Sequence, residues 1–200
     1  MMTMKTPIIE PSEQLISEQR IILQGISWQQ YETLRTTLDQ VPGAKMSYLE
    51  GLLEIMTPSP EHEYKKATIG RLLDIYSLDK GIRLYRCGSP TLKQELAKRG
   101  KEPDESYNLE TKKEIPDLAI EVIISSGGLD ILSIYQGLGV PEVWLWKNNK
   151  LSIYRLREQG YEEIARSEFL PDLDLELLSR YINYSDQYDA VIEFRKAIQK

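Results

Sequence analysis

The sequence predicts a mixed α/β (α+β) fold in which helices flank a sheet, and three observations support this class. Ser59 and Pro60 together are typical of a helix start, and the apolar residues after them recur at helical spacing as far as Gly81. From residue 82 the apolar period changes to two, which indicates strands. A helical pattern returns at 129–138. The middle of the chain is therefore predicted to run helix, three strands, helix, strand.

The N-terminal part is predicted to form an arm, a helix and a hairpin. Residues 1–24 are expected to be a loose arm with at most one short strand at its end. Ser27 has the position of an N-cap for a helix that Pro42-Gly43 stops. Residues 45–57 contain two short apolar runs around Glu50-Gly51, a pattern typical of a β-hairpin.

The remaining elements are predicted from apolar patterns and turn residues. The predicted strands are 82–87, 103–109, 116–124, 142–147, 150–158 and 161–166. Residues 88–101 are expected to be a polar connection with room for a helical turn, and Asn148-Asn149 suits a type I′ turn. The helix at 129–138 ends at Gly139, and the chain beyond 166 is expected to be helical. With no linker or repeat in view, residues 25–200 are expected to form a single domain.

Composition and charge exclude several classes of protein. The 200 residues are 41% hydrophobic and 28% charged, which is enough for a sizeable core. The net charge of −6, from 25 basic and 31 acidic residues, argues against a general nucleic-acid coat or a basic membrane-surface protein. The single cysteine, Cys87, and the single histidine, His62, exclude a disulfide framework and any zinc site built on several such ligands. A metal site would therefore be built from carboxylates.

Targeting patterns are also informative. The sequence contains no signal-peptide pattern, and no run of residues approaches the ~18 apolar residues of a membrane span. With a single thiol in addition, we expect a cytoplasmic protein with no membrane partner.

The predicted strand 116–124 carries a carboxylate in its middle. Alternate residues of a strand face the same side, so one face of this strand is wholly apolar and the other carries Asp117 and Glu121. An ionised carboxylate in a buried strand is costly without a partner. Glu121 is therefore either paired with an arginine for structural reasons or part of a functional site.

A second carboxylate can reach Glu121 from the preceding strand. Asp117 is four residues away on the same strand, about 13 Å at a rise of ~3.3 Å per residue, which is too far for both to bind one cation. Asp104 lies at the start of the neighbouring strand, and adjacent strands are ~4.8 Å apart. Asp104 and Glu121 are therefore the candidate metal pair, and Asp117 is expected to begin its strand or orient a neighbour. The structural alternative for Asp104 is a turn aspartate after proline.

His62 and Glu54 are candidates for the surroundings of this pair. His62 precedes Ile69 by seven residues and Leu73 by eleven, which places it on the apolar face of its helix. There it is either a satisfied core or capping residue or a site histidine that hydrogen-bonds a phosphate, water or carboxylate. Glu54, on the second strand of the predicted hairpin, either adds a third carboxylate or faces solvent.

Several segments of the chain resemble one family in sequence and in order. These segments are YLEGLLEIMTPSPEHE, GSPTL, EPDESYNLE, IPDLAIEVIISSGG and IYQGLGVPEVWLW. Over roughly residues 25–180, the chain resembles the Uma-type family of "putative restriction endonucleases", formerly a domain of unknown function common in cyanobacteria, in the PD-(D/E)XK nuclease superfamily. The resemblance implies a restriction-endonuclease-like core of helix, three strands, helix and strand, with an added N-terminal hairpin and C-terminal strands and helix.

The resemblance also implies an activity, which is Mg²⁺- or Mn²⁺-dependent hydrolysis of phosphodiester bonds in DNA. Asp104 and Glu121 match the metal ligands of the family, and His62 and Glu54 match positions near its site. Small nucleases commonly cut two strands as dimers, so a homodimer is expected, with the strands after Pro141 as a candidate contact between subunits.

One group that the resemblance implies is missing from its usual positions. The superfamily lysine two residues after the glutamate corresponds to Ile123, and the family's lysine on the following helix corresponds to Ile131. No lysine or arginine occurs from Glu114 through Trp146. Candidates to supply the cation from elsewhere are Lys65, Lys66 and Lys93.

Three hypotheses therefore stay open. The first is a metal-dependent DNA endonuclease, whose cleavage is lost in Glu121→Ala. The second is a catalytically degenerate relative that binds nucleic acid or a protein, which binds metal without turnover and gains cleavage in Ile131→Lys. The third is a stable fold with structural carboxylates, in which Glu121→Gln changes stability and has no effect on metal binding.

Overall fold

Six strands form the larger of two sheets in the computed structural model, which describes residues 17–41 and 43–199. In spatial order they are β11 (Gly160–Ile164), β10 (Lys150–Arg157), β9 (Glu142–Lys147), β8 (Leu118–Ile123), β7 (Glu105–Leu109) and β4 (Leu84–Arg86). β8 and β9 pair in parallel, and the other neighbours are antiparallel. The sheet is therefore mixed, in agreement with the fold class that the sequence predicts.

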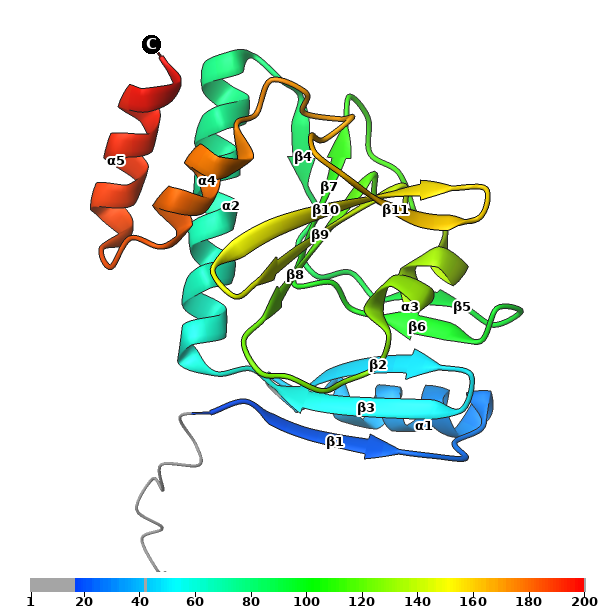
Figure 1. Ribbon diagram of the computed structural model, residues 1–200. Coiled ribbons are helices and arrows are strands. Elements are labelled where there is room, and N and C mark those ends of the chain that lie inside the picture. Colours follow the sequence, from blue (N-terminus) through cyan, green and yellow to red (C-terminus); the bar gives the residue numbers. More distant parts are fainter. Residues whose placement is uncertain (1–16, 42, 200) are drawn as a thin grey trace, which may run out of the picture.

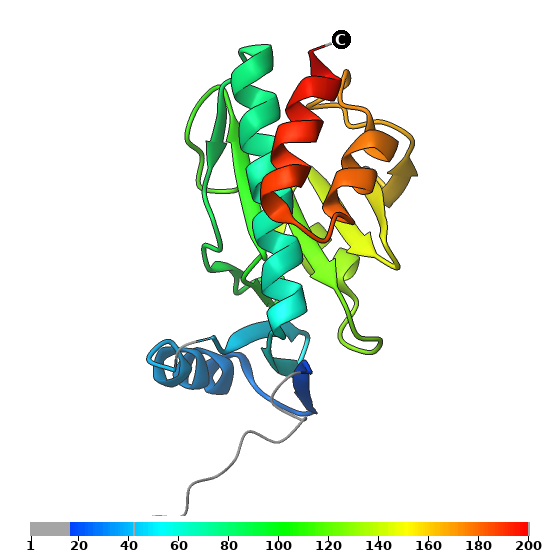
Figure 2. The ribbon, with the colours of Figure 1, turned by 90° about the vertical axis from the view of Figure 1, so that its left-hand side faces the viewer.

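Helices cover both faces of this sheet (Figures 1 and 2). One face packs against α2 (Pro60–Lys80), α4 (Leu175–Ile182) and α5 (Gln187–Ile198), and the other against α3 (Ile131–Leu138). On the first face, Trp144 and Trp146 of β9 are fully buried among residues of α2, α4 and β8. The alternation along β8 divides its side chains between the two faces, with Ile120 on the α2 side and Ala119 on the α3 side.

The long helix α2 has the ends that the sequence predicts. The Ser59 hydroxyl accepts a hydrogen bond from the His62 amide, and Pro60 occupies the first turn. Gly81 ends the helix at φ 68°, in the left-handed region that favours glycine. His62 lies in the first turn of α2, and Figure 1 shows that this end of the helix is the one close to the smaller sheet.

The smaller sheet has five strands and lies at one end of the larger sheet (Figure 1). In spatial order they are β1 (Gln19–Leu23), β3 (Leu52–Thr57), β2 (Lys45–Leu49), β6 (Arg99–Lys101) and β5 (Leu92–Gln94). Helix α1 (Trp28–Leu38) follows the predicted cap Ser27 and packs on this sheet, where Tyr31 and Tyr48 stack at 4.7 Å between ring centroids. The predicted hairpin at 45–57 is therefore present as β2 and β3, and it belongs to the smaller sheet and not to the larger one.

The structure corrects the sequence prediction in two places. The predicted polar connection at 88–101 is a β-hairpin, β5 and β6, and β6 pairs with β2. The region beyond residue 166 holds two helices, α4 and α5, and not the single helix expected after the last strand. β5 and β6 have three residues each, too few to give a clear apolar period.

The predicted N-terminal arm is described in part. Residues 1–16 and Pro42 lie outside the described residues, and β1 pairs with β3 along its whole length. Within residues 17–41 and 43–199, no helix combines the length and apolar character needed to cross a membrane.

Candidate active site

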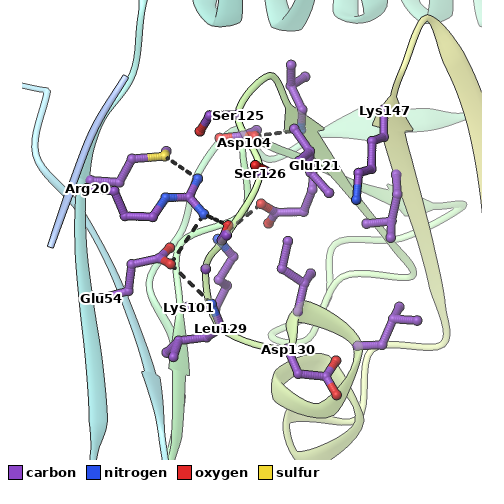
Figure 3. A pocket seen from close by; sticks show the side chains of 18 residues that line it. Arg20, Glu54, Lys101, Asp104, Glu121, Ser125, Ser126, Leu129, Asp130 and Lys147 are labelled. Atoms are coloured by element: carbon purple, nitrogen blue, oxygen red, sulfur yellow. Dashed lines mark hydrogen bonds and ion pairs between the residues drawn. The ribbon is translucent and has the colours of Figure 1, made fainter. Parts of the chain in front are cut away.

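A cavity of about 320 Å³ lies where the two sheets meet (Figure 3). Glu54 and Lys101 line it from the smaller sheet, and Glu121 and Lys147 line it from the larger sheet. The connection from β8 to α3 adds a continuous stretch of the wall, residues 125–130. The cavity is therefore built from segments that are far apart in the sequence.

Asp104 enters this cavity from a three-residue crossover between the sheets. Residues 102–104 join the end of β6 in the smaller sheet to the start of β7 in the larger sheet. The last pair of the β7–β8 ladder is Glu105 with Ile120, so one further step places Asp104 opposite Glu121. The structure thus brings together the two carboxylates that strand spacing selects in the sequence.

Three groups of the chain hold the Asp104 carboxylate, which is 2% exposed. Its Oδ1 atom accepts a hydrogen bond from the Lys45 ammonium. Its Oδ2 atom accepts one from the Val122 amide at 2.8 Å and lies 3.0 Å from Nε2 of the fully buried His62. His62 is therefore bonded to a site carboxylate, which is one of the two roles considered for it.

The charged groups around Asp104 affect its pKa more than burial does. Burial alone would raise the pKa of Asp104, but the hydrogen bond from His62 and the charge of Lys45 together hold that pKa well below its usual range. Burial alone would lower the pKa of His62, but the hydrogen bond and charge of Asp104 raise it. Asp104 is therefore an ionised carboxylate in this setting.

Glu121 is held by one hydroxyl and one ammonium. The Tyr135 hydroxyl of α3 donates to its Oε1 atom, and Nζ of Lys101 lies 3.0 Å from its Oε2 atom. Glu121 is 3% exposed and Lys101 is 6% exposed. Burial raises the pKa of Glu121, with the Lys101 ammonium opposing and the Asp104 charge reinforcing that rise. The structural alternative in the sequence expected arginine as the partner of Glu121, whereas its partner is a lysine from the other sheet.

Glu54 lines the cavity and holds the connection from β8 to α3. Its Oε2 atom accepts a hydrogen bond from the Leu129 amide at 3.1 Å and lies 3.5 Å from the Arg20 guanidinium, which also donates to the Gly127 carbonyl. A Cβ atom at Gly128, where φ is +122°, would lie 2.7 Å from Glu54 Oε2. The close approach therefore requires glycine there, and Glu54 supports the wall of the cavity (Figure 3).

The Asp104–Glu121 pair fits a hard divalent cation. The two carboxylates carry two negative charges. The ammonium groups of Lys45 and Lys101 balance these charges, and one divalent cation carries the same positive charge as the two ammonium groups together. Mg²⁺ is commonly bound by one or two carboxylates and several waters, and each carboxylate oxygen has more than one acceptor site. Within residues 17–41 and 43–199, no group of three or more His, Cys, Asp or Glu side chains is arranged to hold a metal. Waters in the cavity would therefore complete the coordination of such an ion.

Asp117 lies outside the cavity. It accepts hydrogen bonds from the Leu109 amide at 2.9 Å and from the Lys113 ammonium at 2.6 Å and 2.7 Å. It stands directly before β8 and fastens the preceding loop to β7. This agrees with the expectation that Asp117 begins its strand or orients a neighbour.

The lysines proposed from the sequence do not line the cavity, which is a correction. The ammonium of Lys65 donates to the Ile182 carbonyl at 3.2 Å. The other two form ion pairs elsewhere, Lys66 with Glu63 at 2.7 Å and Lys93 with Glu32 at 2.8 Å.

Two other lysines do line the cavity, and sequence reasoning missed both. Lys101 comes from the unpredicted strand β6, and Lys147 is the last residue of β9. Lys147 is the register partner of Ile123, and the side chains of Ile123 and Ile131 line the same cavity. The signal for Lys147 was available, because parallel pairing of β8 and β9 places it beside the position where the resemblance expects a lysine.

The fold and the cavity thus define a mixed α/β protein with a paired-carboxylate site. Residues 28–183 match the model of the Uma2 family, described as "Putative restriction endonuclease", and the protein belongs to this family. No match is found among curated proteins. Among solved structures, the chain is similar to a crystal structure described as a "putative nuclease belonging to DUF820" from Anabaena variabilis ATCC 29413. The identity is 14%, the match covers 74% of this chain and 90% of that chain, and the TM-score is 0.45.

Proposed function

We propose that the protein hydrolyses phosphodiester bonds of DNA with Mg²⁺ or Mn²⁺ held by Asp104 and Glu121. The observation that carries this proposal is the meeting of two buried carboxylates at a cavity where each is already bonded to an ammonium group. Membership of a family described as "Putative restriction endonuclease" supports DNA as the substrate. With a net charge of −6, the contacts to DNA would be local to the cavity.

The residues around the pair have a positioning role in this proposal. Lys101 and Tyr135 fix the Glu121 carboxylate, and His62 fixes Asp104 together with a backbone amide. Groups that orient metal-binding carboxylates raise metal affinity and activity because the ligands do not have to reorganise on binding. A bound Mg²⁺ would polarise the scissile phosphate and lower the pKa of the attacking water.

The proposed reaction consumes one water for each bond that is cut. The water oxygen forms the new bond to phosphorus, and the bond from phosphorus to the leaving sugar oxygen breaks. The electron pair of that bond goes to the leaving oxygen, which takes up a proton from solvent, while a proton of the attacking water is released. No redox step or further co-reactant is involved.

The test is cleavage of supercoiled plasmid by the full chain with Mg²⁺, with Mn²⁺ and with a chelator. We expect nicked or linear product with either metal, none with the chelator, and none with Glu121→Gln. Asp117→Asn is the matched control, because Asp117 precedes the same strand and does not line the cavity. Equal cleavage by wild type and Glu121→Gln would contradict the proposal.

A second candidate function is metal and nucleic-acid binding without turnover. The observation that favours it is the apolar character of Ile123 and Ile131, both of which line the cavity. In this case wild type binds Mn²⁺ and does not cut plasmid, whereas Ile131→Lys adds a cation to the cavity wall and yields cleavage.

We also propose that the protein acts on duplex DNA as a homodimer, because cutting both strands at once requires two such cavities. In the described part of the chain, β11 is an edge of the larger sheet, and the edge of a sheet can pair with a second copy. Analytical ultracentrifugation tests this arrangement, and a single species of monomer mass at the concentrations that support cleavage would contradict it.

A further inference from the structure

Among the residues that the structure describes, three cationic side chains line the cavity, and they differ in what they bind. The Arg20 guanidinium donates to the Gly127 carbonyl and pairs with Glu54. The Lys101 ammonium lies against Glu121. The ammonium of Lys147 has no hydrogen bond or ion pair with any other residue in the ranges 17–41 and 43–199. Lys147 is therefore the lining cation whose charge is available to a ligand.

The pairing of β8 with β9 directs Lys147 toward the carboxylates. In this parallel ladder Glu121 is the partner of Leu145 and Ile123 is the partner of Lys147. Side chains two residues apart share a face of the sheet, and all four of these residues line the cavity. Figure 3 shows the Lys147 side chain reaching from its strand into the space that Glu121 faces.

We propose that the Lys147 ammonium binds the phosphate of DNA that is to be cut, and this inference rests on the proposed function. Negative charge grows on the phosphate oxygens as water attacks, and a cation placed beside them stabilises that charge in the transition state. Lys147 is exposed and meets the cavity from the side opposite the smaller sheet, so it can reach a phosphate that occupies the cavity without breaking a protein contact.

Lys101 has a different part in this arrangement. It is nine-tenths buried and bonded to Glu121, so moving it to a phosphate would leave a buried carboxylate without its partner. Lys101 therefore positions Glu121, and Lys147 contacts the substrate.

The first measurement compares plasmid cleavage by Lys147→Met and Lys150→Met. Lys150 is the register partner of Lys147 in the same hairpin, is exposed, and lies outside this cavity. We expect kcat to fall by about 10²-fold in Lys147→Met, in the range found for losing one preorganised donor to a transition-state charge. Lys150→Met is expected to cut at the rate of wild type.

A second variant tests whether the position of the charge in space matters. Ile123→Lys combined with Lys147→Met moves the cation one strand across, to the register partner on the same face. We expect this double variant to recover part of the cleavage that Lys147→Met loses. A purely structural role for Lys147 would give no recovery.

The third measurement uses DNA binding without turnover, in the Glu121→Gln background. Fluorescence anisotropy with a labelled duplex gives the affinity as a function of salt. Adding Lys147→Met is expected to weaken binding by about tenfold, as for one charge-assisted hydrogen bond. It should also reduce the slope of log K against log salt by about 0.9, the share of one phosphate contact.

The outcomes separate the inference from the proposed function. If wild type binds no Mn²⁺ and cuts no DNA, the proposed function fails, and the anisotropy measurement still decides the role of Lys147. If wild type cuts DNA and Glu121→Gln does not, but Lys147→Met keeps the wild-type rate and the full salt slope, the inference alone is overturned.

Discussion

Two buried glutamates on neighbouring strands of the larger sheet, Glu121 of β8 and Glu142 of β9, have different surroundings. Glu142 is fully buried and accepts hydrogen bonds from the Trp144 indole at 2.7 Å, the Ser167 hydroxyl at 2.5 Å and the Glu168 amide at 3.0 Å. These donors are neutral, the Arg155 guanidinium lies 3.9 Å from Oε2 of Glu142, and none of these groups lines the cavity between the sheets. Glu142 thus fastens the loop after β11 to β9.

Glu121 differs from Glu142 in what lies beside it and not in how deeply it is buried. Its cation, the Lys101 ammonium, lies closer, at 3.0 Å, and it has a second carboxylate as neighbour and open volume in front of it. A carboxylate can be buried both where it only holds the fold together and where it belongs to a functional site. A second carboxylate at the same cavity distinguishes the two, because like charges held together are costly unless a cation joins them.

The largest expected difference between the two glutamates is in DNA cleavage. Glu121→Gln should lower kcat by at least about 10³-fold, because a metal ion contributes several kcal/mol to the transition state and 1.36 kcal/mol is tenfold in rate. Glu142→Gln should keep the rate of wild type. Single-turnover cleavage of plasmid measures both. A loss of similar size in Glu142→Gln, with circular dichroism showing that the variant is folded, would contradict a specific role of Glu121 in cleavage.

Metal-dependent stability is the next largest difference. Mn²⁺ at a hundred times its dissociation constant should raise the free energy of unfolding of wild type by about 2.7 kcal/mol. Glu142→Gln should show the same gain, and Glu121→Gln should show little or none. Urea unfolding with and without Mn²⁺ gives these values. An equal gain in Glu121→Gln would place the metal somewhere other than this pair.

The two glutamates should also differ in how much each contributes to stability without metal. Glu142→Gln keeps one oxygen as acceptor for Trp144 and Ser167 and presents its amide nitrogen to the Glu168 amide, so it should cost about 1–3 kcal/mol of unfolding free energy for the unsatisfied buried donors. In Glu121→Gln the amide retains an acceptor for Tyr135, but the buried Lys101 ammonium is left without its carboxylate, so the loss should be larger, about 3–5 kcal/mol. Urea unfolding in a chelator measures both, and a smaller loss in Glu121→Gln than in Glu142→Gln would contradict this order.

The smallest expected effects come from removing one hydroxyl group that donates a hydrogen bond to each glutamate. Tyr135→Phe removes a donor to Glu121 and should lower the affinity for Mn²⁺ by about tenfold, the lower limit for loss of a group that orients a metal ligand. Ser167→Ala removes a donor to Glu142 and should change stability by about 1 kcal/mol with no effect on Mn²⁺. Isothermal titration with Mn²⁺ compares the two variants. An equal change in affinity for both would contradict the prediction that Tyr135 orients the metal ligand Glu121.

Local signals in the sequence were enough for much of the fold. The caps of α2, the Asn148-Asn149 turn and the alternation in β8 depend on neighbouring residues only, and the structure has each of them. The hairpin of β5 and β6 was missed because each strand has three residues and little apolar content. Its strands exist because β6 pairs with β2, a contact between distant parts of the chain.

The candidate site likewise has one feature that local spacing predicts and others that depend on contacts between distant parts of the chain. The closeness of Asp104 and Glu121 follows from the spacing of adjacent strands, so it could be predicted from the sequence. Lys101 reaches Glu121 only because β6 pairs with β2 in a separate sheet. The run without lysine or arginine ends at Trp146, and Lys147 follows directly, but its place at the cavity depends on the register of β8 and β9.

The crossover of residues 102–104 has a consequence for how the chain can change length during evolution. It directly follows Lys101, the last residue of β6, and ends at Asp104, so one inserted residue would turn the carboxylate toward the opposite face of its sheet. The tip of the hairpin just before it is exposed, with Leu96 95% accessible, and can lengthen freely. Insertions and deletions in descendants of this protein should therefore accumulate at the tip and be absent from the crossover.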